Sequence, residues 1–237
     1  MKRFLLTSAC LFLMLIPTVE AADVDETIVI LVRHGKTFYN DEGRCQGALD
    51  TPLNPLGIQQ AELLAERLKD VPIDVFISSP LERAYLTTKK CADAQGKPIA
   101  YTDIRLKELD YGDWAGKLYS DIAKEYPKQY KLANEKPWKI KYPNGGTLKE
   151  MQSRYRAALD DAVARYPGKV IFIGAHSGGN AALLCDLLGL KLDSYKRIRQ
   201  DNTCVNVLQY KNGEWKVLLM NSVDHLGYLY NGMKKAA

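Results

Sequence analysis

The sequence is poor in the residues from which metal sites and nucleic-acid-binding surfaces are usually built. It holds three histidines and five cysteines among 237 residues, and no Cys-x-x-Cys pair or Cys/His spacing of the zinc-binding kind occurs. It also lacks internal repeats, low-complexity tracts and an obvious interdomain linker. Lysines and arginines are spread among acids, so the net charge of +5 does not indicate nucleic-acid binding. A mildly positive chain does suit a small anionic ligand.

A continuous apolar run of membrane-spanning length is also missing, because such a run needs about 20 residues. Met1-Lys2-Arg3 is basic, residues 4–16 are nearly all apolar, and Val19-Glu20-Ala21 offers small residues for cleavage. This order is typical of a secretory signal peptide. We therefore predict a signal peptide over 1–21 and an exported protein, periplasmic or secreted, without membrane attachment after cleavage. An uncleaved anchor is one alternative, and a lipoprotein is disfavoured because Cys10 lies inside the apolar run.

The cysteines outside the signal peptide are even in number, which would permit two disulfides in an exported chain. A core of this size does not need covalent cross-links, so four buried free thiols are the favoured alternative. The four residues are Cys45, Cys91, Cys185 and Cys204.

Strand and helix patterns alternate along the chain. The segments with the composition of buried strands are 27–32, 74–78 and 169–174. Helices are expected after three N-terminal signals: Asn54-Pro55, the capping box Ser79-Pro80-Leu81-Glu82, and Thr147 with Glu150. A fourth, apolar helix is expected around 181–188, and residues 205–210 and 215–220 read as a hairpin.

This alternation predicts one α/β domain over 22–237, a three-layer sandwich in which a mainly parallel sheet has helices on both faces. Residues 99–146 are less regular and contain Pro127, Pro137 and Pro143. We interpret them as a helical and loop insertion that covers the site.

Two of the three histidines closely follow predicted strands. The first strand ends in Arg33-His34-Gly35, and the strand over 169–174 is followed by Ala175-His176-Ser177. Because parallel strands end at the same edge of a sheet, the two imidazoles are expected to converge there. A lone histidine in such a place is more often structural, but two at strand ends favour a site. His225 has no such position and is expected to be structural.

Phosphoryl transfer needs cations for the phosphoryl oxygens, a nucleophile and a proton donor. Arg33 and the two imidazoles supply part of this set. Arg83, in the first turn of the helix after 74–78, is unfavourable there unless an anion is bound; a surface arginine paired with Glu82 or Asp74 is the alternative. Glu108 is the best candidate acid, although Asp110 and Asp113 compete and composition cannot choose among them.

Together these motifs resemble the histidine phosphatase superfamily, also called phosphoglycerate mutase-like, in its branch of mutases and small phosphatases. The matching segments run in the family's order: Arg33–Thr37 with Asn40, Arg44–Gly57, Ser78–Ala84, Glu108 ahead of Tyr111–Gly116, and Ala175–Gly179. Five anchors in order make the resemblance specific, whereas Arg-His-Gly alone would be weak.

The resemblance implies a role for each matching residue. His34 would be the nucleophile that forms a phosphohistidine, and Glu108 would protonate the leaving alkoxide and then help water attack. His176 would complete the catalytic set by binding phosphoryl oxygens. The other substrate-binding residues would be Arg33, Asn40, Arg83 and Ser177. No metal and no cofactor are implied, because guanidinium and imidazole groups already supply the positive charge.

The function predicted in this way is an exported phosphomonoesterase acting on a small organic phosphate. The alternatives are a cofactor-dependent phosphoglycerate mutase and a non-catalytic phospho-ligand binding protein. A signal peptide disfavours the mutase, since glycolytic bisphosphates are not expected outside the cytoplasm, and 99–146 lacks an evident basic cluster for a second phosphate. Gly145-Gly146-Thr147 replaces the family's frequent Gly-Glu-Ser-like sequence, which weakens any transfer of substrate identity. The sequence leaves the oligomeric state open.

Overall fold

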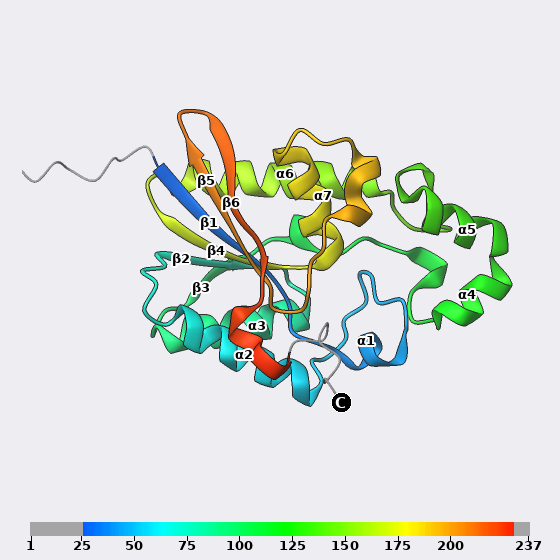
Figure 1. Cartoon of the computed structure of the whole chain (residues 1–237), viewed down its shortest axis with the longest axis horizontal. Helices are drawn as coiled ribbons and strands as arrows, with labels where there is room; N and C mark the ends of the chain where they lie inside the picture. Colours follow the sequence, from blue (N-terminus) through cyan, green and yellow to red (C-terminus); the bar gives the residue numbers. More distant parts are fainter. Residues whose placement is uncertain (1–25, 230–237) are drawn as a thin grey trace, which may run out of the picture.

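A computed structural model describes residues 26–229, so the predicted signal peptide and Cys10 lie outside the described residues. The fold is an α/β fold built on a six-stranded mixed sheet with the strand order β3-β2-β4-β1-β5-β6 (Figure 1). The strands are β1 (Glu26–Arg33), β2 (Val75–Ser78), β3 (Ile99–Thr102), β4 (Val170–Ala175), β5 (Val205–Lys211) and β6 (Glu214–Ser222). The first four pair in parallel, and the β5–β6 hairpin joins β1 in antiparallel fashion. The predicted fold class is confirmed.

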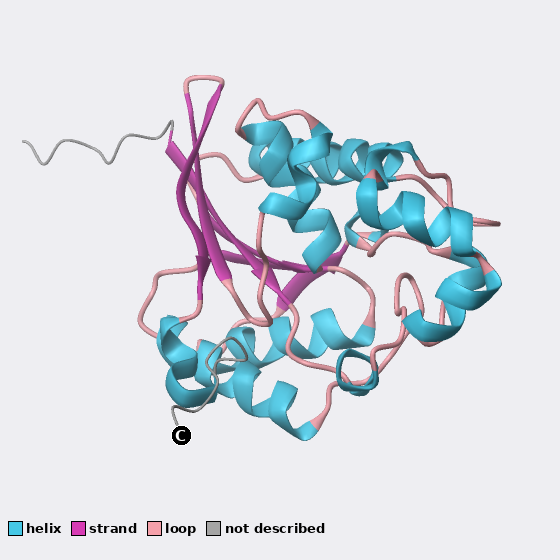
Figure 2. Cartoon of the chain, turned by 45° about the vertical axis from the view of Figure 1, so that its right-hand side comes forward, coloured by secondary structure: helices cyan, strands magenta, loops and turns pink. Residues whose placement is uncertain are grey.

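Helices cover both faces of the sheet (Figures 1 and 2). On one face lie α2 (Pro55–Leu68) and α3 (Glu82–Ala94), and on the other lie α6 (Leu148–Arg165) and α7 (Ser177–Leu187). Each face has its own cluster of buried apolar side chains, because β-strand residues alternate between the two faces. None of the described helices is long and apolar enough to cross a membrane.

All three predicted helices form, but one of their three N-terminal signals, the capping box at Ser79, is wrong. Asn54 caps α2 by accepting a hydrogen bond from Gly57 N, and Thr147 and Glu150 form a capping box at α6. However, α3 begins only at Glu82, and Leu81 precedes it without a side-chain cap. The Ser79 hydroxyl instead lies 2.8 Å from His176 Nε2. The local pattern assigned the Ser79 side chain to capping, but in the structure it contacts His176, which is distant in the sequence.

The stretch 99–146 contains more order than its sequence pattern suggests. Its first four residues form β3, which pairs with β2 at the edge of the sheet. This strand was not predicted, because it is short and none of its side chains is fully buried. The rest forms short helices: η1 (Ile104–Leu106), η2 (Gly112–Trp114), α4 (Tyr119–Glu125), α5 (Pro127–Glu135) and η3 (Pro137–Lys139). Figure 1 shows α4 and α5 beyond the end of the sheet, on the same side as the short α1 (Phe38–Glu42).

The four cysteines of the described chain are buried free thiols, which confirms the alternative that was favoured over two disulfides. Burial raises the pKa of Cys91 and Cys204 to about 12. Both thiols are therefore protonated near neutral pH. Cys91 belongs to the apolar packing, whereas the Cys204 thiol donates to Gln200 Oε1 at 3.3 Å.

His225 lies in η5 (Asp224–Leu229) and links this segment to α2. Arg67 lies 3.1 Å from its Nδ1, and Thr203 Oγ1 lies 3.1 Å from its Nε2. Because a guanidinium can only donate, Nδ1 accepts and the ring proton sits on Nε2. Burial, then the charge of Arg67, lowers the pKa of His225 to about 4. The expected structural role agrees with these contacts.

This pKa makes folding sensitive to acid. Between about pH 6.5, the ordinary histidine pKa, and about pH 4, the unfolded chain binds a proton at position 225 that the folded chain does not. The free energy of unfolding should therefore fall as the pH falls through this range. The variant His225→Gln should lose less stability over the same range than the wild type, as measured by urea unfolding at pH 7, 6, 5 and 4. Identical pH dependences would contradict this assignment.

Candidate active site

The site is built where three neighbouring parallel strands end. In the sheet, Arg33 of β1 lies opposite Ala175 of β4, and Ser78 of β2 lies opposite Gly174. The residues that follow these strands, His34, His176 and Ser79, therefore lie together. The ring centroids of the two histidines are 5.2 Å apart, which is the convergence expected from the strand ends.

His34 is held as a neutral imidazole with a defined tautomer. Its Nδ1 lies 2.6 Å from the carbonyl oxygen of Gly35. A carbonyl only accepts, so Nδ1 carries the proton and Nε2 keeps its lone pair. Burial, followed by the charges of Arg83 and Arg33, holds the pKa of His34 well below 6.5. A neutral ring with a free Nε2 lone pair is the form that can act as a nucleophile.

Arg83 is a buried cation rather than a surface residue, being 1% exposed. It donates to the backbone carbonyls of Gly47 and Leu49, each at 2.7 Å. It forms no ion pair with a described carboxylate, so the alternative pairing with Glu82 or Asp74 is wrong. Burial lowers the pKa of Arg83 to about 10, and its Nε has no hydrogen-bond partner among the described residues.

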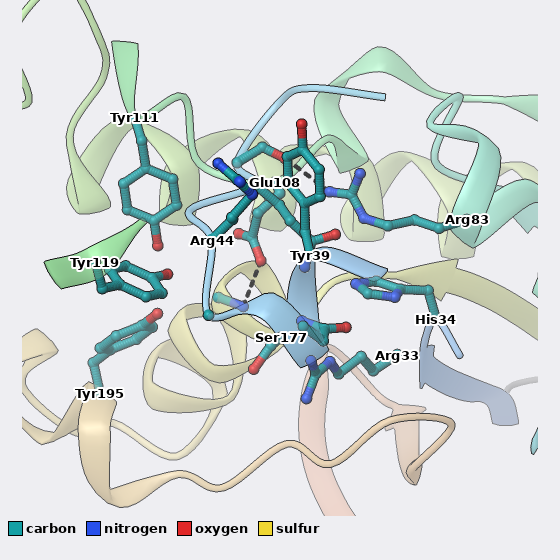
Figure 3. A pocket seen from close by; sticks show the side chains of 15 residues that line it. Arg33, His34, Tyr39, Arg44, Arg83, Glu108, Tyr111, Tyr119, Ser177 and Tyr195 are labelled. Atoms are coloured by element: carbon teal, nitrogen blue, oxygen red, sulfur yellow. Dashed lines mark hydrogen bonds between the residues drawn. The ribbon is translucent and has the colours of Figure 1, made fainter. Parts of the chain in front are cut away.

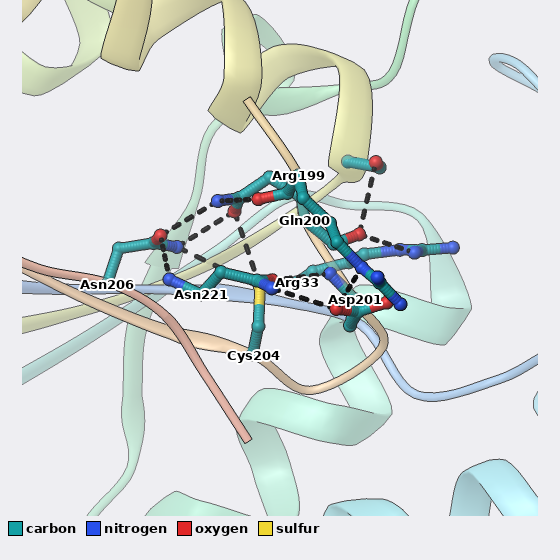
Figure 4. Close-up of polar contacts among 8 residues, drawn as sticks. Arg33, Arg199, Gln200, Asp201, Cys204, Asn206 and Asn221 are labelled. Carbon is teal, nitrogen blue, oxygen red and sulfur yellow. Dashed lines mark hydrogen bonds and ion pairs between the residues drawn. The ribbon is translucent and has the colours of Figure 1, made fainter. Parts of the chain in front are cut away.

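Arg33 is oriented by a loop that the sequence did not single out (Figure 4). Its Nη1 donates to the carbonyl of Gln200 at 2.7 Å. The Gln200 amide exchanges hydrogen bonds with Asn206, whose Nδ2 also donates to the carbonyl of Leu31. The one available signal was Asn206 itself, a buried amide between two valines of a predicted strand. Arg33 Nε, like Arg83 Nε, is buried and lacks a partner among the described residues.

Glu108 is brought to the site from the region between β3 and α6. Its Oε2 accepts a hydrogen bond of 2.9 Å from Gly178 N in the first turn of α7, and Oε1 accepts one from Leu109 N. Arg154 of α6 donates to the carbonyls of Arg105, Lys107 and Glu108, which fixes the backbone of this segment. No feature of the sequence singles out Arg154.

The two competing acids are placed elsewhere. Asp110 accepts from Gly112 N, and Asp113 accepts from Asn144. Neither lines the pocket that contains Glu108. Composition could not choose among the three acids, but only Glu108 is placed in the pocket.

These groups open into a pocket of about 250 Å³ (Figure 3). Six of the predicted site residues line it: Arg33, His34, Asn40, Arg83, Glu108 and Ser177. His176 is fully buried beside His34, and its Nδ1 is a third buried nitrogen without a partner among the described residues. The Asn40 side chain also accepts from Thr37 N and so caps α1. Glu108 is the only acid among the described lining residues, so the pocket favours an anion.

Comparisons with known proteins agree with this geometry. The family description "Histidine phosphatase superfamily (branch 1)" matches residues 29–223. Phosphoserine phosphatase 1 of Hydrogenobacter thermophilus is 33% identical over 88% of this chain and 98% of its own length. A probable phosphoglycerate mutase of Yersinia pestis is 34% identical over 79% and 86%, respectively. The solved structure of Bacillus stearothermophilus YhfR superposes with a TM-score of 0.81 at 28% identity, covering 84% of this chain and 99% of that one.

Buried donors without partners should bind a tetrahedral anion. Inorganic phosphate is expected to raise the Tm of the wild-type protein, because a ligand that binds only the folded state stabilises it. In Arg83→Gln the phosphate-dependent rise in Tm should be lost, whatever the Tm of the variant without phosphate. Thermal unfolding over a phosphate titration measures both, with His225→Gln as the control that keeps the response. An equal rise in Arg83→Gln would place the anion elsewhere.

Proposed function

Since the chain belongs to the histidine phosphatase superfamily, branch 1, we propose that it is an exported phosphomonoesterase that hydrolyses small organic phosphates through a phosphohistidine at His34. One observation carries the proposal. Three buried nitrogens, Arg33 Nε, Arg83 Nε and His176 Nδ1, have no hydrogen-bond partner in the described part of the chain, and they accompany a neutral His34 whose Nε2 lone pair is free. The Ser79 hydroxyl, which accepts from Leu81 N, can donate to His176 Nε2, leaving the proton on Nδ1. These three N–H groups can then donate hydrogen bonds to phosphoryl oxygens.

In the first step, His34 Nε2 attacks phosphorus and the bond to the ester oxygen breaks. Arg33, Arg83 and His176 stabilise the charge on the non-bridging oxygens, which is the main demand of this reaction. Ser177 and Asn40, on the pocket wall, contribute to substrate binding. Glu108 gives its proton to the leaving alkoxide, so the alcohol departs neutral and Glu108 becomes a carboxylate.

In the second step, water replaces the alcohol. The Glu108 carboxylate takes a proton from water as the oxygen attacks phosphorus, and the bond to His34 Nε2 breaks. Phosphate leaves, and both His34 and Glu108 return to their starting forms. One acid–base residue thus serves both steps because leaving alcohol and attacking water occupy the same side of phosphorus.

The mutase remains the main rival, because one of the relatives bears that name. A mutase must bind a second anionic group, and the remaining cation on the described pocket wall, Arg44, is already paired with Glu42 at 2.5 Å. An assay with 3-phosphoglycerate and its bisphosphate discriminates the two: release of inorganic phosphate supports the phosphatase, and isomerisation without release overturns it.

Export is proposed from the N-terminal sequence alone. Expressed in a Gram-negative bacterial host, the full chain should fractionate with the periplasm and begin at residue 22 by mass spectrometry. A chain lacking residues 1–21 should stay in the cytoplasm. Retention of the full chain in the cytoplasm, with its N-terminus intact, would refute export while leaving the catalytic proposal untouched.

Replacing His34 by Ala should abolish turnover, because it removes the Nε2 lone pair that attacks phosphorus. Rapid acid-free quenching with labelled substrate should trap an acid-labile phosphoenzyme in the wild type and none in the variant. The Tm of His34→Ala should stay close to that of the wild type. Phosphate release at a near-wild-type rate would defeat the mechanism.

Replacing Glu108 by Gln removes the proton donor but keeps the shape. Alkyl phosphates, whose alkoxides need a proton, should slow by about 100-fold, in line with general acid catalysis. p-Nitrophenyl phosphate should slow much less, because its leaving group is stable as an anion. Equal losses of kcat for both esters would count against the acid role.

The variant Gly178→Ala tests Glu108 by displacing its carboxylate instead of replacing the residue. A Cβ on Gly178 would lie 2.5 Å from Glu108 Oε1, so the carboxylate must move. The selective loss of kcat on alkyl phosphates that is expected of Glu108→Gln should therefore reappear in Gly178→Ala. The Tm should change little, because the atom that must move is at the end of a flexible side chain. Gly146→Ala is the matched control, since its Cβ would meet its nearest atom at an ordinary 3.5 Å.

A further inference from the structure

A second cavity adjoins the proposed active site and is not used by the mechanism. It has a volume of about 200 Å³ and lies among η2, α4, α5, η3 and η4 (Leu192–Arg197). Its wall is dominated by six aromatic side chains: Tyr111, Trp114, Tyr119, Tyr130, Tyr142 and Tyr195. For comparison, an apolar cavity of roughly 150 Å³ accommodates benzene. The space therefore suffices for one aromatic ring.

The two cavities share a wall of three tyrosines. Tyr111, Tyr119 and Tyr195 line both of them, and Figure 3 shows their hydroxyl groups pointing toward one another. Burial raises the pKa of all three phenols. The boundary between the cavities is thus polar but uncharged, and a neutral group can lie against it.

Trp114 gives the second cavity a specific chemical feature. The side chain is 2% exposed, and its Nε1 is buried without a hydrogen-bond partner among the described residues. Its ring packs edge-on against Tyr142, with centroids 5.0 Å apart. A buried N–H donor without a partner is unfavourable, so a ligand atom that reaches Nε1 and accepts a hydrogen bond from it would be stabilised.

The reaction geometry directs the alcohol part of the substrate toward this cavity. In-line displacement places the leaving oxygen on the side of phosphorus opposite His34 Nε2. In Figure 3 the Glu108 carboxylate lies between His34 on one side and the tyrosine wall on the other. Once Glu108 has protonated the leaving oxygen, the remainder of the alcohol extends toward Tyr111, Tyr119 and Tyr195.

We propose that the preferred substrates are phosphate monoesters whose alcohol carries an aromatic ring with a hydrogen-bond acceptor, and that this ring occupies the second cavity. The inference rests on the proposed phosphatase function and names its substrate class. An anionic group at this place is disfavoured, because the one cation among the described lining residues, Lys196, is exposed and already donates to the carbonyl of Asn134.

The test compares esters with the same chemistry at phosphorus. Propyl phosphate and 3-phenylpropyl phosphate have alcohols of similar acidity, so a difference in kcat/KM reports binding of the ring. The wild type should prefer the phenylpropyl ester by about tenfold or more, as expected for burial of one ring. Among the three pyridylpropyl esters, the best isomer should exceed the phenylpropyl ester by about fivefold, because its nitrogen accepts from Trp114.

Two variants locate the ring. Ala133, on α5, lines the second cavity, and Ala133→Phe should fill it and bring the phenylpropyl-to-propyl ratio close to one. Ala157→Phe, at an exposed position of α6, is the matched control and should keep the wild-type ratio. Trp114→Phe should keep the preference for phenylpropyl over propyl phosphate but lose the advantage of the pyridyl ester.

The outcomes separate the two proposals. Equal kcat/KM values for propyl and phenylpropyl phosphate in an active wild type would overturn the ring subsite and leave the phosphatase standing. A preference that persists in Ala133→Phe would overturn it as well. If no ester is hydrolysed, the catalytic proposal fails, and calorimetric titration still tests the cavity. Tighter binding of phenylpropyl than of propyl phosphate, lost in Ala133→Phe, supports the subsite, and equal binding refutes it.

Discussion

The burial of the Arg83 guanidinium without a carboxylate partner is the constraint on which the site depends. Desolvating a cation is expensive, and here two backbone carbonyls of the loop before α2 compensate for it only in part. Burial, and then the charge of Arg83, lowers the pKa of both His34 and His176, so the two neighbouring imidazoles are neutral. In the proposed mechanism a bound phosphoryl group supplies the missing negative charge. The buried charge of Arg83 would thus favour an anionic ligand and, together with burial, help to keep the proposed nucleophile neutral.

The sheet determines where the residues around Arg83 lie. Parallel pairing of β1, β4 and β2 brings His34, His176 and Ser79 to one edge, whereas Glu108 comes from outside the sheet. Its carboxylate is fixed by an N–H of the first turn of α7, and its backbone by Arg154 of α6. The proposed nucleophile and the proposed acid therefore rest on different elements, which would let them face phosphorus from different sides.

The sequence predicted what depends on local patterns and strand order, and missed what depends on distant contacts. The strand ends carrying His34 and His176 follow from apolar runs, and the caps of α2 and α6 follow from residues three apart. By contrast, the residue that orients Arg33 lies 167 positions away. The residues around Ser79 match a capping box, but the Ser79 hydroxyl lies against His176, which is distant in the sequence. The edge strand β3 depends on pairing with β2, because it has only four residues and none of their side chains is fully buried. Such contacts leave no short-range signal.

The same distinction separates chemistry from specificity in this protein. The phosphate end of the pocket is defined by charge, which few residue types can supply, so a short motif reveals it. The alcohol end that we propose is defined by the shape of an aromatic wall drawn from η2, α4, α5 and η4, where many side chains would fit. At Gly112 and Gly145 the backbones of two segments approach so closely that neither could carry a Cβ without displacing the other. This contact fixes Tyr111 and Trp114 against the core, so the position of the aromatic wall depends on glycines that carry no chemistry of their own.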